Sequence, residues 1–260
     1  AFAACLLPVL LGFLLPALQL LTWTFTTAEE TISWSFFTLT WHSLMLAAIA
    51  ALVAVVLALL LAYGKRLRST PLIEGSVRAA AMGYAVPGTV IAVGVLIPFA
   101  WLDNTIDGWM RDTFGISTGL LLSGTLVALI FAYTVRFLSV SIQAVESGLA
   151  KIKPSMDDAG RSLGLRPMGV LRRIHLPIMK GTVLTALLLV FVDVLKELPA
   201  TLILRPFNFN TLAVRAYEMA ADERLADAGA PALMIVLAGI IPVILLSRAI
   251  SRARAGGEIQ

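Results

Sequence analysis

The chain has 260 residues, of which 59% are hydrophobic and 14% are charged, and its mean hydropathy is +0.91. This balance excludes an ordinary soluble domain and indicates an all-α polytopic membrane protein. The net charge of +4 is modest, and the single cysteine, Cys5, lies in an apolar run, which excludes a disulfide framework.

Six apolar segments are long enough to cross a bilayer as helices. We expect the first at about 1–21 and the second between Glu30 and Lys65, centred on 44–62. The other four are expected at about 80–101, 117–133, 177–198 and 230–246. Pro8 and Pro16 would kink the first segment, which has neither the basic start nor the cleavage site of a signal peptide. The chain also lacks an initiator Met, so we expect a piece of a longer protein.

The third segment contains Gly83, Pro87-Gly88 and Gly94, and such breaks are tolerated where neighbouring helices satisfy the freed backbone groups. We therefore expect it to pack inside the bundle. An acidic loop is expected to follow it, with the charged and aromatic residues Asp103, Asp107, Trp109, Arg111 and Asp112.

Charge divides the chain between two sides. Three segments lie on one side: the connector after the second span, the loop between spans four and five that begins at Arg136, and the C-terminal tail. Counted with Lys180 at the start of span five, they hold 15 of the 20 Lys and Arg residues but 5 of the 16 acidic ones. Basic residues concentrate on the cytoplasmic side of membrane proteins. We therefore expect a multi-pass protein of the bacterial inner membrane with both termini in the cytoplasm.

The loop between spans four and five carries a polar, basic stretch at 155–177. Ser155 and Asp158 have the spacing of a capping pair at a helix start. Gly164 can end that helix, and Pro167 can begin a second one. We expect two short helices that form an exposed knob.

This stretch resembles the hallmark of binding-protein-dependent ABC importer permeases, which reads Glu-Ala-Ala, three residues, Gly, nine residues, Ile-x-Leu-Pro. Asp158 stands for the Glu, and Gly160 for the second Ala, a change that costs a helix up to about 1 kcal/mol. The candidate coupling residues are Asp157, Asp158, Ala159, Gly160, Gly164, Ile174, Leu176 and Pro177.

The resemblance implies a type I ABC importer permease domain of six helices over 1–260. Within it we expect a cytoplasmic coupling loop at 137–176, and a periplasmic loop with an amphipathic helix at 199–229. The implied partners are two ATPase subunits, a periplasmic binding protein, a second permease domain and the lipid bilayer, with no nucleic acid. The chain would bind no cofactor, because ATP-Mg is used by the partner ATPase.

The segment 196–201 reads Lys-Glu-Leu-Pro-Ala-Thr and, with Leu-Arg-Pro-Phe-Asn-Phe at 204–209, resembles ferric-iron permeases. In that subfamily two such domains are commonly fused, and this chain is similar to the second half. Ferric iron is the expected cargo. Relatives that carry thiamine, polyamines, sulfate, molybdate or phosphonates share the architecture and stay as alternatives.

Span five carries three charges, Asp193, Lys196 and Glu197, which share one helical face. Ionisable groups in a membrane segment must be paired or face a wet cavity. Two interpretations remain open for them, a structural ion pair near the outer interface and a lining of the translocation path.

The outer segment after Pro199 is expected to include a surface helix, because Val214, Tyr217 and Ala221 form an apolar stripe that extends to Leu225. This helix could simply cover the bundle. It could also contact a binding protein through Arg205, Arg215 and Glu218.

Catalytic motifs are absent from the sequence. There is no phosphate-binding Gly-x-x-x-x-Gly-Lys-Ser/Thr loop, and His42 and His175 lie in separate segments, so we expect neither ATP hydrolysis nor a metal site in this chain. A secondary transporter driven by ions bound at Asp193 and Glu197 is the alternative from another class. A membrane-embedded enzyme ranks last.

Overall fold

The computed structural model describes the backbone of residues 2–255 and the side chains of residues 5–244, 247 and 248. This part of the chain is helical and contains no strand. Its long helices are α4 (Trp34–Leu67), α6 (Gly88–Phe114), α7 (Leu126–Leu149), α10 (Leu176–Leu195) and α13 (Gly229–Ala255). The shorter ones are α1 (Phe2–Val9), α2 (Leu15–Thr26), α3 (Ala28–Thr31), α5 (Pro71–Ala80), α8 (Pro154–Ser162), α9 (Pro167–Val170), α11 (Pro199–Leu204) and α12 (Leu212–Ala221).

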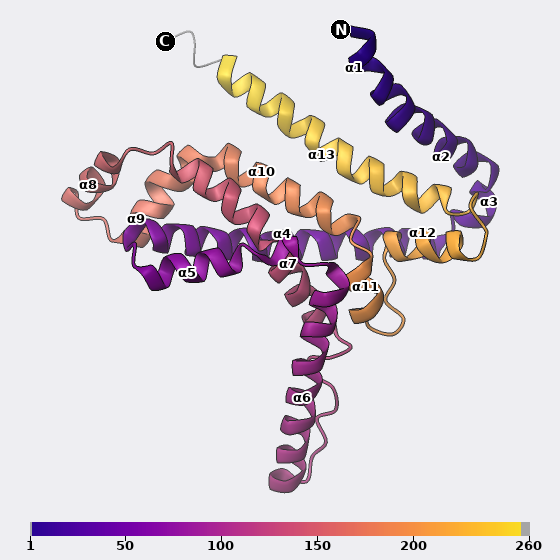
Figure 1. The fold of residues 1–260 in the computed structure, drawn as a ribbon, viewed down its shortest axis with the longest axis horizontal. Helices are drawn as coiled ribbons and strands as arrows, with labels where there is room; N and C mark the ends of the chain where they lie inside the picture. Colours follow the sequence, from indigo (N-terminus) through magenta and orange to yellow (C-terminus); the bar gives the residue numbers. More distant parts are fainter. Residues whose placement is uncertain (1, 256–260) are drawn as a thin grey trace.

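The centre of the fold is formed by α4, α7 and α10, which contact one another, while α13 packs against α10 and α2 (Figure 1). The short helices α5, α8 and α9 gather at one end of this bundle, and α3 and α12 lie at the other end (Figure 1). Helix α6 projects away from the rest (Figure 1). Its main contacts are with α7 and α11.

Close packing of the centre depends on small side chains along α4. Ala47, Ala50, Ala51, Ala54 and Ala58 are all buried and form a stripe at helical spacing. Without a hydrophobic driving force between helices in lipid, such small residues let backbones approach and gain dispersion contacts. The stripe therefore sets how closely α7 and α10 approach α4.

Five helical segments have the length and hydropathy to cross a membrane: Cys5–Thr26, Trp34–Leu67, Gly88–Phe114, Leu126–Leu149 and Pro167–Leu195. The sixth predicted span corresponds to α13, whose described apolar part is Gly229–Ile244. In the first span, Pro8 lies inside α1, and a π-helical turn, η1 (Leu10–Leu14), joins α1 to α2. Ala1 and the C-terminal residues 256–260 lie outside the described part, as do the side chains of the tail's Arg252 and Arg254.

The predicted limits of the third and fourth spans are wrong. Helix α6 starts at Gly88, after a short 3-10 turn, η2 (Gly83–Ala85), and continues to Phe114, so the expected acidic loop is the C-terminal part of a helix. Helix α7 starts at Leu126 rather than Ser117 and continues to Leu149. Residues 137–149 of the expected coupling loop are therefore helical.

Two carboxylates of α6 account for the late start of α7. The buried Asp103 accepts hydrogen bonds from the backbone N–H groups of Leu121, Leu122 and Ser123, at 3.1, 2.9 and 2.7 Å. Asp107 accepts from the N–H of Thr118 at 2.7 Å. These bonds hold residues 115–125 alongside α6 as an irregular strap, so its apolar residues do not begin a helix.

Candidate functional site

The coupling segment, residues 154–177, consists of α8, α9, a π-helical turn η3 (Leu171–His175) and the start of α10. Helix α8 begins at Pro154, and its N-cap, Lys153, makes no side-chain capping bond. The predicted capping by Ser155 is therefore wrong, because a proline at the first helical position already sets the backbone for the helix. Pro167 begins α9, as predicted.

Gly164 ends α8 in the left-handed conformation, with φ of +81°. The N–H of Leu165 donates to the carbonyl of Gly160 at 3.0 Å, and the N–H of Gly164 donates to that of Arg161 at 2.9 Å. This pair of bonds is the Schellman arrangement, which favours glycine at the left-handed position. The predicted helix end at Gly164 is confirmed.

Gly160 has a packing role that the sequence did not reveal. A Cβ placed there would lie 2.8 Å from Cδ1 of Ile174 and 3.2 Å from Cγ2 of Val170. The missing side chain therefore lets α8 lie directly on α9 and η3. The expected cost of Gly160 in helix propensity stays a prediction, and its missing side chain allows the two halves of the coupling segment to touch.

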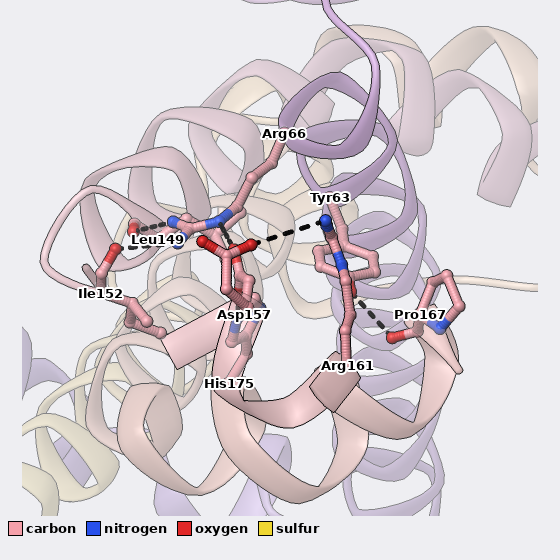
Figure 2. Close-up of polar contacts among 9 residues, drawn as sticks. Tyr63, Arg66, Leu149, Ile152, Asp157, Arg161, Pro167 and His175 are labelled. Carbon is pink, nitrogen blue, oxygen red and sulfur yellow. Dashed lines mark hydrogen bonds and ion pairs between the residues drawn. The ribbon is translucent and has the colours of Figure 1, made fainter. Parts of the chain in front are cut away.

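Asp157 is the buried polar centre of the coupling segment (Figure 2). Its Oδ2 accepts a hydrogen bond from Nε of Arg66 at 2.8 Å, and its Oδ1 contacts Nε2 of the buried His175. Arg66 also donates to the carbonyls of Leu149 and Ile152, at 2.6 and 2.8 Å. One guanidinium from α4 thus forms hydrogen bonds to the Asp157 carboxylate of α8 and to backbone carbonyls at the end of α7.

Tyr63, one turn before Arg66, adds a second link from α4. Its hydroxyl donates to the carbonyl of Pro167 at 2.8 Å, and its ring meets the ring of His175 edge to face, with centroids 5.3 Å apart (Figure 2). Both short helices of the coupling segment are therefore fixed to the end of α4.

The charge state of Asp157 follows from these contacts. Burial of the carboxyl raises its pKa, but the hydrogen bonds and charges of Arg66 and His175 outweigh burial, so that the pKa is lowered from its ordinary value. Asp157 is therefore an ionised partner for the Arg66 guanidinium at neutral pH.

The opposite face of the coupling segment is open. The side chain of Asp158 is 73% exposed, and its ion pair is a 3.8 Å contact with Arg161. Leu163, Met168, Arg172 and Arg173 are exposed as well. The segment thus has one face fixed to the bundle and one face of apolar and charged groups available to another protein.

The coupling segment also contains the other residues predicted for it. These are Ala159, Gly160, Gly164 and Ile174, together with Leu176 and Pro177, which begin α10.

The three charges of span five do not form one cluster. Lys196 pairs with Asp193 at 2.9 Å across the end of α10. Glu197 pairs instead with Arg136 of α7, its Oε2 lying 3.3 Å from Nε. Sequence reasoning missed this pair because Arg136 was assigned to the basic loop, whereas it lies inside α7.

At the other end of the bundle, Glu218 brings together the residues predicted for a binding-protein contact. Its carboxylate lies 3.2 Å from Arg205 and 3.9 Å from Arg215. A cleft of about 560 Å³ beside Arg215 is lined also by His42, Asn210 and Asp227. His42 stacks on Phe209, with ring centroids 4.6 Å apart. The described residues contain no cluster of His, Cys, Asp and Glu that could hold a metal ion.

Residues 54–255 match the family model described as "Binding-protein-dependent transport system inner membrane component". The chain belongs to this family of permeases. Members of this family are the membrane components of ABC transporters and are not catalytic themselves. The matched range includes the whole coupling segment.

Two curated relatives are similar to the permease in sequence. The Fe(3+)-transport system permease protein FbpB 2 of Haemophilus influenzae is 32% identical over 64% of this chain, and the putative 2-aminoethylphosphonate transport system permease protein PhnV of Salmonella typhimurium is 25% identical over 65%. The matches span 29% and 57% of these relatives.

Solved transporters share the fold. A chain of a bacterial alginate ABC transporter, solved in complex with an alginate pentasaccharide-bound periplasmic protein, superposes with a TM-score of 0.73 at 14% identity, over 97% of this permease and 94% of that chain. A chain of the MetNI methionine ABC transporter gives 0.60 at 16% identity, over 85% and 99%. The expected type I importer fold is confirmed.

Proposed function

We propose that the permease is the membrane-spanning subunit of an ATP-driven importer that receives substrate from a periplasmic binding protein and passes it into the cytoplasm. Family membership supports this role. The observation that carries it is the two-faced coupling segment, fixed to α4 by Arg66 and Tyr63 and open at Asp158.

The open face is the proposed dock for one of two ATPase subunits, which use ATP-Mg. Because Arg66 of α4 is bonded to Asp157 of α8 and also to the carbonyls of Leu149 and Ile152 at the end of α7, a displaced α8 cannot move alone. A push on the segment would move α4, α7 and α10 together. Such a rigid body with two arrangements is what coupling requires.

The proposed ATPase-binding face sets the orientation that we propose for the permease in the membrane. The coupling segment, α5 and both termini face the cytoplasm, and α12 faces the periplasm across the bacterial inner membrane. A second permease domain, fused or separate, completes the pathway. The cleft beside Arg215, with Arg205 and Glu218, is the proposed contact for the binding protein, and the Asp193–Lys196 pair is the proposed lining of the path.

Ferric iron is the proposed cargo, because the ferric-transport relative is 32% identical. The phosphonate relative, at 25%, makes 2-aminoethylphosphonate the second candidate. Reconstituted transporter with its ATPase and binding protein, assayed for uptake of radioactive ferric iron or of the phosphonate, tests both.

We expect uptake of one cargo only when ATP is supplied on the ATPase side. Uptake driven by an ion gradient without ATP would contradict the proposal and favour a secondary transporter.

A further inference from the structure

Two interruptions of helical backbone meet beside the middle of α7. Residues 86–87 separate η2 from α6, and residues 196–198 separate α10 from α11. Arg136 lies beside both, about 15 Å along α7 from its start at Leu126. Inside a bilayer, the polar backbone groups freed at such interruptions must find partners within the protein.

The ion pair between Arg136 and Glu197 provides partners to both interruptions. Nη1 of Arg136 donates to the carbonyl of Val86 at 3.0 Å, and its Nε lies 3.3 Å from the Glu197 carboxylate. Oε1 of Glu197 accepts from the N–H of Ala200 at 3.2 Å, in the first turn of α11. One ion pair therefore connects the start of α6, the middle of α7, and the chain between α10 and α11.

The backbone around the pair is closely packed. A Cβ on Gly88 would lie 2.6 Å from Oε1 of Glu197 and 3.0 Å from Nη1 of Arg136. A Cβ on Gly83 would lie 1.9 Å from the carbonyl oxygen of Val135. The turn η2 thus lies directly on the backbone of α7, and the start of α6 lies against the side chains of Arg136 and Glu197. A shift of α7 at this point must therefore shift η2 and the start of α6.

Helices α7 and α10, which the ion pair joins, lie on either side of the coupling segment in the chain. Helix α7 leads into it through residues 150–153, and α10 follows directly after His175. The ion pair joins α7 to the far end of α10, while Asp157 holds the coupling segment at the near end. Helix α6 starts at the ion pair and from there extends away from the bundle (Figure 1).

We propose that Arg136 and Glu197 are positioning residues that form a joint through which motion of the coupling segment reaches α6. This inference rests on the proposed function. The pair is closed to cargo, since its side chains are only 19% and 6% exposed. The neighbouring Asp193–Lys196 pair lies within one helix end and does not connect separate elements.

The test is a distance measurement in the complete transporter with its ATPase. Exposed residues of α6 and α13 are replaced by cysteine (Trp109→Cys and Ile241→Cys) in a Cys5→Ser background and spin-labelled. The distance between the two labels is compared without nucleotide and with ATP and vanadate. We expect ATP to change this distance in the parent. In Glu197→Gln we expect that change to be lost, although the ATPase still co-purifies and hydrolyses ATP.

Glu74→Gln is the matched control, because it removes a carboxylate from a surface ion pair within α5 and should keep the distance change. If the distance between the labels changes as much in Glu197→Gln as in the parent, or does not change in the parent, the proposal is wrong. Neither result would affect the proposed function, which is judged by ATP-dependent uptake and by recovery of the ATPase.

If Glu197→Gln does not assemble, Arg136→Lys decides the question. A lysine ammonium cannot reach both Val86 and Glu197 as the guanidinium fork does, so we expect a reduced distance change, and a full one would overturn the joint.

Discussion

Arg66 of α4 and Asp157 of α8, which are 91 residues apart in the chain, form a 2.8 Å hydrogen bond between opposite charges. The remaining nitrogens of the same guanidinium hold the backbone that joins α7 to α8. The coupling segment is therefore part of the helical bundle rather than a loop hanging from it, and adjacent aspartates have separate tasks. Asp157 holds the segment, and Asp158 is exposed on its other face.

Asp157→Asn should destabilise the folded permease by about 2 kcal/mol, because it leaves the Arg66 guanidinium and His175 without their charged partner. Thermal unfolding of the detergent-solubilised protein measures this. Asp158→Asn is the matched control and should leave the unfolding temperature unchanged, since that side chain is exposed. Equal losses in the two variants would show that Asp157 has no special structural role.

Acid should remove the contribution of Asp157. Its pKa in the folded protein is below the ordinary value of 3.8, so the stabilisation is fully present above that value and is lost as the pH falls through the lower folded pKa. The difference in unfolding free energy between the parent and Asp157→Asn should be constant at neutral pH and shrink below about pH 4. A difference that persists unchanged in acid would contradict the ionised pair.

Gly160→Ala should reveal the contact between α8 and Ile174. The new methyl gains up to about 1 kcal/mol of helix propensity but meets Cδ1 of Ile174 at 2.8 Å. Ile174→Val removes that atom. We therefore expect Gly160→Ala to be more favourable in the Ile174→Val background by about 1 kcal/mol, measured by a double-mutant cycle of unfolding free energies. Additive effects would show that the two residues do not touch.

Gly164→Ala should destabilise the protein by about 1–2 kcal/mol, because φ of +81° is unfavourable for a residue with a Cβ. No atom lies within 4 Å of the new methyl, so the cost is conformational rather than steric. Gly75→Ala, in the middle of α5 with similar space around it, should instead stabilise by about 0.5–1 kcal/mol. Unfolding curves that show the same sign at both positions would contradict this assignment.

The coupling segment was the most predictable part of the chain, because its helix limits depend on local signals. Gly164 and Pro167 set a helix end and a helix start through their own backbone preferences. The predicted helix cap at Ser155 was wrong because Pro154, one residue earlier, already begins α8. Asp157 was included in the site, but its partners lie in α4 and η3, and no spacing in the sequence indicates them.

The centre of the bundle was harder to predict for the same reason. Arg136 and Glu197 are 61 residues apart, and a basic residue between two apolar segments is indistinguishable from a loop residue until the helix limits are known. Those limits in turn depend on Asp103, which holds an irregular strap against α6 through backbone contacts. Long-range polar contacts of this kind decide where helices end and leave no periodic pattern.

The most direct test of the account is a pull-down of the affinity-tagged, full-length parent protein from detergent, with the co-purifying polypeptides identified and ATP hydrolysis measured. We expect an ATPase to be recovered with the native protein. It should be lost with Asp158→Lys and retained with Glu74→Lys, which reverses another charge at the same end of the bundle. Purification of the native protein without an ATPase, or equal recovery with Asp158→Lys, would contradict the assignment of the coupling segment.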